Sequence, residues 1–399
     1  MIPRLKPDLS WHEIATLFKI NKLDDVPEFE CAFATLMGKK HAIFFPYGRT
    51  GLLFLLEALG ISDQEIICPA YTCVVVPHAI VLSRNEPVFV DSNPEDFNMN
   101  WDQVESVTSS NTAAVIATSL FGNPVNLDAL KDYMKKNPNV FIIQDCAHSY
   151  AASWKGEQVQ KVGHAAFYGS NISKIITSIF GGMVTTDDSA LADRLHYIRD
   201  KRITKSSFKK DIKMRLYLLG AWLTFQDSIY GFTNKLEHLG FLDHFIQYYD
   251  ENKIDMPIDF LADTTPTQGR IGTIQCKRYS KILIGRKKIA NYYNQKLRDL
   301  GDLILPSMIE GTTYSHYVVQ TKHRKALMNH ALKRGVQLGQ LIEYCIPDMP
   351  SYQRRTGNRM TYPVASRLSR QTVNLPISLS GSTEKASKVI STLLTFPFN

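Results

Sequence analysis

One lysine occupies a position in which an amine could act as a nucleophile. Lys174 lies between two apolar, strand-like runs in FYGSNISKIITSIFGGMVTT (residues 167–186), with hydroxyl groups nearby, among them Ser170. A partly desolvated lysine loses its proton more readily and can form a Schiff base, and the hydroxyls could hold a phosphate. The Gly181-Gly182 pair allows close backbone approach before the next strand. A lysine in an exposed loop explains this motif equally well when it is taken alone.

A carboxylate at the end of an apolar run is the second candidate. Asp145 closes the strand-like part of FIIQDCAHS (residues 141–149). A carboxylate in such a place is costly unless it meets a positive partner. The protonated ring nitrogen of a bound cofactor would be such a partner, and the pairing would keep the ring electron-withdrawing. An aspartate on the surface, or one that caps the next helix, gives the same pattern.

The third candidate is a turn that could hold an anion. In FFPYGRTGLL (residues 44–53) a strand-like run, a glycine-containing turn and the start of a helix follow one another. The backbone N–H groups at such a turn can bind an anion. Because many α/β proteins have a glycine in this place, the turn alone is weak support.

The first half of the chain alternates strand-like and helix-like segments. Helical patterns at Thr50–Leu59, Val74–Ser83 and Asn126–Lys136 separate strands that are apolar on both faces. This alternation predicts an α/β fold with a mostly parallel sheet covered by helices, whose ligands bind at the carboxyl ends of the strands. The strands are expected at His41–Phe45, Glu65–Pro69, Glu86–Asp91, Ala113–Leu120, Val140–Ala147, His164–Ser170 and Gly182–Thr186.

The second half predicts a different organisation. Residues from Arg202 to about Asp250 open basic and turn aromatic and apolar, and a long helical pattern runs from Gly269 to Leu300. The tail then predicts a smaller α+β domain. Its elements are a strand at His316–Thr321, a helix at Lys325–Arg334, a strand near Val373–Leu375 and a helix at Thr383–Leu394.

Composition narrows the class of protein. The 399 residues carry a net charge of +8, which suits anionic partners, but no finger, helix-turn-helix or RNA-binding signature is present and nucleic acid is not expected. The six cysteines are scattered, so neither a disulfide framework nor a metal site is indicated. The N-terminus lacks the apolar region of a signal peptide, and no stretch is long enough to span a membrane. A cytoplasmic location is expected.

Taken together, the order and spacing of the three motifs resemble the fold type I enzymes that use pyridoxal 5′-phosphate (PLP). More closely, the chain resembles the DegT/StrS-type family, which aminates nucleotide-linked sugars. The resemblance is specific over residues 41–200 and looser over 266–395. Its motifs, besides Lys174 followed seven residues later by Gly181-Gly182, are ALGISDQEIICPAYT (58–72), EPVFVD (86–91), LFGNPVNLDAL (120–130), DCAH (145–148), HYVVQ (316–320), RGVQ (334–337), YPVASRLS (362–369) and NLPISL (374–379).

The resemblance implies roles for single residues. Lys174 matches the lysine that forms the Schiff base with PLP, Asp145 matches the partner of the ring nitrogen, and His148 matches a position beside the ring. The remaining cofactor-binding candidates are Gly48, Arg49 and Thr50 in the phosphate turn, Ser170 as the phosphate-binding serine, and Tyr71 as the residue that stacks on the ring.

Some positions depart from the family pattern. The family's serine usually lies five residues before the lysine, which is Gly169 here, so choosing Ser170 implies a shift of one residue. The stacking aromatic falls at or near Cys73, and Tyr71 is named as its substitute. Phe180 stands where an acidic or amide residue often precedes the glycine pair.

Residues 202–250 replace the loop whose asparagine usually reaches the phosphate in the neighbouring subunit. We expect this insertion to be either a helical pair packed on the enzyme or its dimer partner, or a peripheral contact with a membrane surface. The large PLP-binding domain is expected to span residues 1–265, and the long helix with the small C-terminal domain residues 266–399.

The resemblance implies an aminotransferase that moves an amino group from an amino acid, glutamate in this family, to a nucleotide-linked keto-sugar. It also implies a homodimer. Two alternatives stay open: transamination of a non-sugar ketone, and a catalytically silent relative that acts as a regulator or assembly partner.

Overall fold

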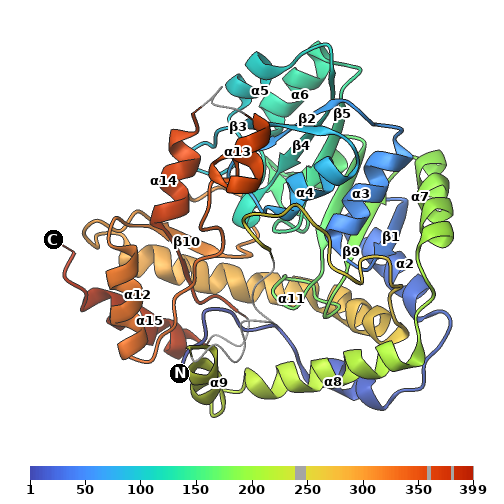
Figure 1. Ribbon diagram of the computed structural model, residues 1–399. Helices are drawn as coiled ribbons and strands as arrows, with labels where there is room; N and C mark the ends of the chain where they lie inside the picture. The colour runs from blue at the N-terminus through green and yellow to red at the C-terminus, as the bar shows by residue number, and fades with distance from the viewer. Residues whose placement is uncertain (239–248, 357–360, 379–381, 399) are drawn as a thin grey trace.

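A computed structural model describes residues 1–238, 249–356, 361–378 and 382–398. Its centre is a seven-stranded sheet in the order β1-β9-β8-β5-β4-β2-β3 (Figure 1). Neighbouring strands from β8 to β3 are parallel, whereas β9 is antiparallel to both β8 and β1. The expected mostly parallel sheet is therefore confirmed. The strands are β1 (His41–Phe45), β2 (Glu65–Pro69), β3 (Glu86–Val90), β4 (Thr112–Thr118), β5 (Phe141–Asp145), β8 (Ala165–Gly169) and β9 (Gly182–Thr186).

Helices cover both faces of the sheet because its strands carry apolar side chains on both sides. In β1, Ile43 and Phe45 pack in one core, and Phe44 packs in the other. The first core includes α3 (Gly48–Ala58), α4 (Val75–Leu82) and α7 (Ser189–Arg202). The second includes α2 (Asp25–Met37), α5 (Trp101–Val107), α6 (Leu127–Lys136) and part of α11 (Pro266–Leu297).

The C-terminal part forms a third core. Thr265 caps α11 and forms a reciprocal capping box with Gln268, which explains why the long helix begins at Pro266. The C-terminal half of α11 packs with a two-stranded antiparallel sheet and its helices, as expected. These elements are β10 (Tyr317–Gln320), β11 (Thr372–Leu375), α12 (Arg324–Lys333) and α15 (Thr383–Leu394). Helix α14 (Pro363–Gln371) packs instead in the first core, through Ala365 and Leu368. We propose to keep the domain boundary at 265/266, where α11 begins.

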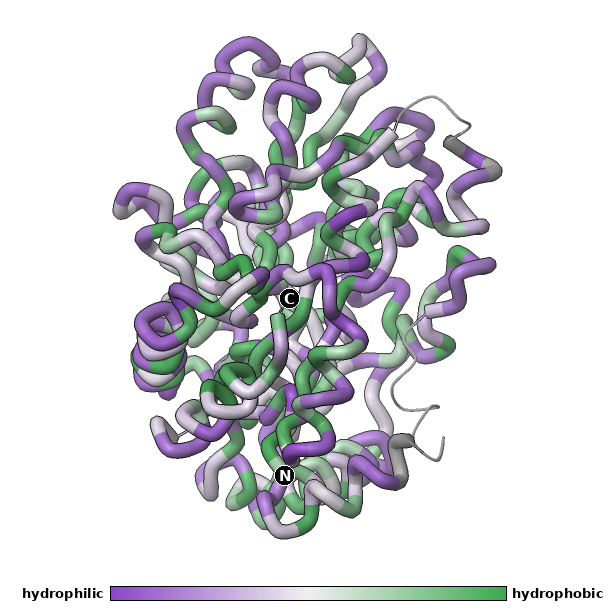
Figure 2. Tube along the Cα trace, turned by 90° about the vertical axis from the view of Figure 1, so that its left-hand side faces the viewer, coloured by the Kyte–Doolittle hydropathy of each residue, from purple (hydrophilic) through white to green (hydrophobic). Residues whose placement is uncertain are grey.

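The described part of the insertion contains two helices, α8 (Phe208–Thr224) and α9 (Tyr230–His238). Residues 239–248 of the predicted insertion lie outside the described residues. Figure 1 shows α8 along the lower edge of the molecule, away from the sheet. In Figure 2 the interior segments are mostly hydrophobic and the outer helices carry most of the hydrophilic residues. The shorter elements are α1 (Trp11–Ile14), η1 (Ala15–Phe18), η2 (Leu120–Gly122), β6 (Ser153–Trp154), β7 (Glu157–Gln158), η3 (Val159–Lys161), η4 (Ile346–Asp348) and α13 (Pro350–Thr356).

Candidate active site

The three sequence motifs meet at one edge of the sheet. Asp145 is the last residue of β5, and Lys174 lies in the loop that follows β8. Since β1 and β8 are both antiparallel to β9, β1 points in the same direction as β8 and β5. Its end leads into α3 at Gly48. The carboxyl edge of a parallel sheet, where α/β proteins bind ligands, therefore carries all three candidates.

Lys174 and Asp145 each shift the pKa of the other. Burial lowers the pKa of the partly buried Lys174, and the electrostatic effects of Cys73 and Asp145 oppose that shift. Burial also raises the pKa of Asp145, which is 4% exposed, to about 6; a hydrogen bond from the Ala147 N–H (3.0 Å) and the charge of Lys174 pull it back. An amine that releases its proton more easily therefore acts on a buried carboxylate whose ionisation burial disfavours.

His148 lies beside this pair in a neutral ring cluster. Its Nδ1 accepts a hydrogen bond from the Phe121 N–H (3.4 Å), and the two rings stack with centroids 5.9 Å apart. The ring of His316 lies 5.0 Å from that of His148. Burial, reinforced by the charge of Lys174, holds the pKa of both histidines well below the usual value. His148 is therefore neutral with its proton on Nε2, which makes that atom a hydrogen-bond donor.

The phosphate turn lies against the start of β9. Tyr47 precedes α3 in an extended conformation and provides no side-chain cap, so backbone N–H groups of the first turn remain available. A Cβ atom on Gly182 would lie 2.2 Å from the Gly48 nitrogen. The Gly181-Gly182 pair thus allows β9 and α3 to touch, which is the close approach that the sequence predicts.

Two hydroxyl groups named from the sequence are used within the chain. The Ser170 hydroxyl lies 2.8 Å from that of Ser178, and Ser170 is buried. The Thr50 hydroxyl donates to the Phe260 carbonyl oxygen at 3.2 Å. The first bond lies within the loop between β8 and β9, and the second joins α3 to the loop that contains Phe260. The role of both residues as phosphate ligands stays a prediction.

Arg49 adds a cation at the same edge of the sheet, in the first turn of α3. No hydrogen bond or ion pair joins its guanidinium to the described part of the chain, and burial lowers its pKa. Cys73 and Asp255 are the largest opposing influences on that pKa. Cys73 acts electrostatically on both Lys174 and Arg49, so these three side chains lie in the same part of the site.

Tyr71 lies deeper than a stacking residue would. Its hydroxyl is bonded with Thr372 (2.9 Å) and Ile342 (3.3 Å), and its ring contacts Phe121 edge-on at 6.2 Å. Cys73, at the family's aromatic position, acts electrostatically on Lys174. The stacking role of Tyr71 stays a prediction.

The sequence analysis did not identify three residues near the site: Phe121, His316 and Tyr344. The Tyr344 hydroxyl accepts a hydrogen bond from the Val74 N–H at 3.0 Å. The family motifs LFGNPVNLDAL and HYVVQ contain the first two, and this is the only signal that could have found them.

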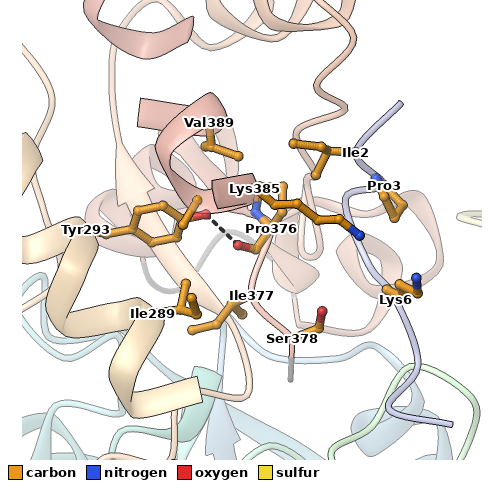
Figure 3. A pocket seen from close by; sticks show the side chains of 11 residues that line it. Ile2, Pro3, Lys6, Ile289, Tyr293, Pro376, Ile377, Ser378, Lys385 and Val389 are labelled. Carbon is orange, nitrogen blue, oxygen red and sulfur yellow. Dashed lines mark hydrogen bonds between the residues drawn. The ribbon is translucent and has the colours of Figure 1, made fainter. Parts of the chain in front are cut away.

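A small pocket in the C-terminal part is separate from this site. Figure 3 shows that α11, α15 and the N-terminal segment line it, with the Tyr293 hydroxyl donating to the Pro376 carbonyl oxygen (2.7 Å). None of the catalytic candidates lines it.

The fold, with a partly buried lysine and a buried aspartate at the edge of the sheet, is that of the fold type I aminotransferases. The chain belongs to the DegT/DnrJ/EryC1/StrS aminotransferase family, whose pattern matches residues 13–394.

Curated relatives are similar over most of their length. The spore coat polysaccharide biosynthesis protein SpsC of Bacillus subtilis is 24% identical over 93% of this chain and 89% of its own. GDP-perosamine synthase of Escherichia coli O157:H7 is 23% identical, with 93% and 90% covered. The dTDP-3-amino-3,6-dideoxy-alpha-D-galactopyranose transaminase of Aneurinibacillus thermoaerophilus is 24% identical, with 92% and 88% covered.

Solved structures show the same fold. DesV of S. venezuelae, determined in complex with a ketimine intermediate, has a TM-score of 0.77 at 20% identity, with 98% of each chain covered. PseC of Helicobacter pylori, an aminotransferase of pseudoaminic acid biosynthesis, has a TM-score of 0.78 at 18% identity, also with 98% of each chain covered.

Proposed function

We propose that this aminotransferase carries PLP on Lys174 and transfers an amino group from an amino acid, such as glutamate, to a nucleotide-linked keto-sugar. The observation that carries the proposal is the placement of Lys174 beside the buried Asp145. The names of the relatives support a sugar acceptor, since they include two sugar-nucleotide enzymes and a polysaccharide biosynthesis protein.

The residues present fit this cofactor. Asp145 is buried and would be stabilised as an anion by a protonated ring nitrogen, because burial otherwise raises its pKa. The uncapped start of α3, with Gly48 and Arg49, offers N–H groups and a cation to the phosphate. His148 offers a neutral N–H donor at the ring. When bound, PLP supplies an electron sink for the substrate carbon.

The chain's own contribution to the reaction is then a proton transfer. Desolvation lowers the pKa of Lys174, so its amine can exist in the neutral form that accepts a proton from the substrate carbon. The same amine then returns the proton to the other reacting carbon. Asp145 would keep the ring nitrogen of the cofactor protonated, and so the ring electron-withdrawing, without taking part in this proton transfer.

A homodimer and a cytoplasmic location complete the proposal, as the family resemblance implies. Two alternatives compete with it. A non-sugar ketone as acceptor would show as turnover with simple keto acids but not with nucleotide-linked keto-sugars. A silent relative would bind no PLP, and the purified protein would be colourless.

Mapping the cofactor tests the central assignment. Borohydride reduction of the PLP-loaded protein followed by peptide mapping should place the pyridoxyl group on Lys174. The Lys174→Ala variant should lose turnover but keep its fold. Lys155→Ala is the matched control, because that side chain is 73% exposed in a surface ion pair. A pyridoxyl group on another lysine would refute the assignment.

A substrate screen tests the acceptor. Nucleotide-linked keto-sugars and simple keto acids are offered to the amino-loaded enzyme, and the return of the PLP absorbance is followed. The proposal requires faster return with at least one nucleotide-linked sugar than with any keto acid.

A further inference from the structure

Helix α8 presents a continuous apolar stripe to solvent. Met214 and Leu218 are buried against the enzyme, so one face of the helix already has its packing partner. The stripe lies on another face and, at 100° per residue, fills an arc of about 80°. It consists of Phe208 (72% exposed), Ile212 (41%), Leu216 (64%), Leu219 (37%) and Leu223 (40%). Packing on the enzyme's own body accounts for the buried face of α8 and leaves this stripe without a partner in the described chain.

The N-terminal segment extends the apolar surface beside α8. Arg215 of α8 donates to the carbonyl oxygens of Leu17 (2.6 Å) and Lys19 (3.0 Å), and the rings of Trp11 and Trp222 lie 4.8 Å apart. This segment adds four exposed side chains: Trp11 (69%), Phe18 (86%), Ile20 (88%) and Leu23 (97%). We call these four residues and the five of the stripe the α8 face.

The exposed side chains are held outwards by a firmly attached backbone. Three ion pairs join the N-terminal segment to residues eight apart along α11. They are Asp25–Arg270 (2.5 Å), Glu13–Arg278 and Asp8–Arg286 (2.8 Å). Because residues 11–23 lie between two of these attachments, the apolar groups cannot simply turn inwards.

Positive charge outweighs negative charge around the α8 face, where Asp24, next to Leu23, is an exposed carboxylate at the border. The only carboxylates in residues 9–23 and 205–223 are Glu13 and Asp211, and both are buried and paired with arginines. Five exposed lysines lie in the same two segments: Lys19, Lys22, Lys205, Lys209 and Lys213. On α8, Lys209 and Lys213 follow the stripe along its edge opposite the N-terminal segment.

This combination of side chains selects the partner. A second copy of the face would bring five lysines against five lysines, with Asp24 as the exposed carboxylate at the border, and like charges repel. An anionic lipid surface is complementary on both counts, because apolar groups insert between the head groups while the lysines meet phosphates. In the part of the chain that the structure describes, no helix is both long and apolar enough to cross a bilayer. We propose that the α8 face docks the enzyme on an anionic membrane surface, with α8 lying in the interfacial plane.

Vesicle flotation with the full-length enzyme tests the proposal. The protein should float with vesicles of phosphatidylglycerol and phosphatidylcholine at low salt, but not with phosphatidylcholine alone, and 0.5 M salt should release it. The Lys209→Gln/Lys213→Gln variant should partition about 25-fold more weakly, at about fivefold per lysine. Leu216→Gln/Leu219→Gln should also lose flotation, since the apolar insertion is removed.

Matched controls separate this face from general charge and apolarity. Lys135→Gln/Lys155→Gln removes two exposed lysines elsewhere, and Ile284→Gln removes a 69% exposed apolar group on α11. Both should float like wild type. Equal losses in the controls, or no flotation of wild type at low salt, would overturn the proposal. So would dissociation of an oligomer by the leucine variant in sedimentation velocity, because the face would then be a contact between protein chains.

Discussion

Gly182 and Gly48 lie in direct backbone contact: a Cβ atom on Gly182 would be 2.2 Å from the Gly48 nitrogen and 2.3 Å from its Cα. Only a residue without a side chain fits at the start of β9. This contact fixes the first turn of α3, the proposed phosphate site, against the strand that leaves the Lys174 loop.

We predict that Gly182→Ala displaces the start of α3. Overpacking of this kind costs about 1–3 kcal/mol of stability, and the backbone N–H groups lose their alignment, so PLP affinity should fall by at least about tenfold. Absorbance titration with PLP and thermal melts measure the two effects.

The control is Gly231→Ala in α9, where an added Cβ would contact nothing within 4 Å. It should bind PLP like wild type. Normal PLP affinity in Gly182→Ala would mean that the contact does not position the phosphate turn.

Asp145 makes a prediction about pH in the cofactor-free enzyme. Its pKa is raised to about 6, chiefly by burial, so the folded state binds its proton more tightly than the unfolded state does. Ionising this carboxyl therefore costs stability, about 2–3 kcal/mol, and the cost grows as pH rises from about 4 to 6. Asp145→Asn removes this cost of ionisation. Without PLP, the free energy of unfolding of the variant should therefore rise relative to that of wild type as the pH goes from about 4 to 6.

Activity of the Asp145→Asn variant should change in the opposite direction. The neutral amide that this substitution introduces cannot hold the proton on a ring nitrogen, so turnover should fall by orders of magnitude. Denaturant melts at pH 4 and pH 7.5 and a transamination assay provide the measurements. A stability difference that is independent of pH, or turnover near wild type, would contradict the assigned role.

Much of the sheet could be predicted because its strands are short apolar runs between turn signals. The bounds of β1, β2 and β9 agree with the sequence expectation residue for residue. Helix α2 was not among the predicted elements, although its buried Phe29, Phe33 and Met37 are four residues apart, a spacing from which it could have been predicted.

The site was only partly accessible from the sequence. Lys174 and Asp145 have local signals, because Asp145 ends an apolar strand and Lys174 lies in the loop between two apolar strands. His316 does not: it immediately precedes β10 in the C-terminal part, and only the tertiary fold brings the centroid of its ring within 5.0 Å of that of His148. For the same reason the sequence could not show that Ser170 bonds Ser178, or that Tyr71 faces Thr372.

Arg49 should contribute a charge to cofactor binding. Its guanidinium has no bonded partner in the described residues and lies near Cys73, as Lys174 does. A charge-assisted hydrogen bond to phosphate is worth about 1.5–3 kcal/mol, so Arg49→Met should raise the Kd for PLP about 10–100-fold. Arg49→Lys should recover part of this loss.

Arg84→Met serves as the control, because Arg84 is 76% exposed and pairs with Asp63 on the surface. Its Kd for PLP should equal that of wild type. If Arg49→Met also bound PLP normally, the guanidinium would have to serve another anion, and the KM values of the amino donor and the nucleotide-sugar would show which.

Removing one partner of the buried ion pair between Asp8 and Arg286 should strongly lower stability. The two side chains are 1% and 2% exposed, their charged atoms are 2.8 Å apart, and Arg286 also donates to the Ser315 carbonyl oxygen at 2.9 Å. Asp8→Ala leaves the guanidinium buried without its counter-ion, which costs about 3–5 kcal/mol. Denaturant unfolding of the cofactor-free protein should show this decrease.

The exposed pair of Asp63 and Arg84 provides the comparison. Asp63→Ala should change stability by less than about 1 kcal/mol, because water already screens that pair. The double variant Asp8→Leu/Arg286→Met should recover most of the loss, since it removes both charges and fills the space with apolar atoms. If Asp8→Ala cost no more than Asp63→Ala, this pair would not fix the N-terminal segment to α11. The exposed position of the segment's apolar side chains would then depend on the ion pairs Asp25–Arg270 and Glu13–Arg278.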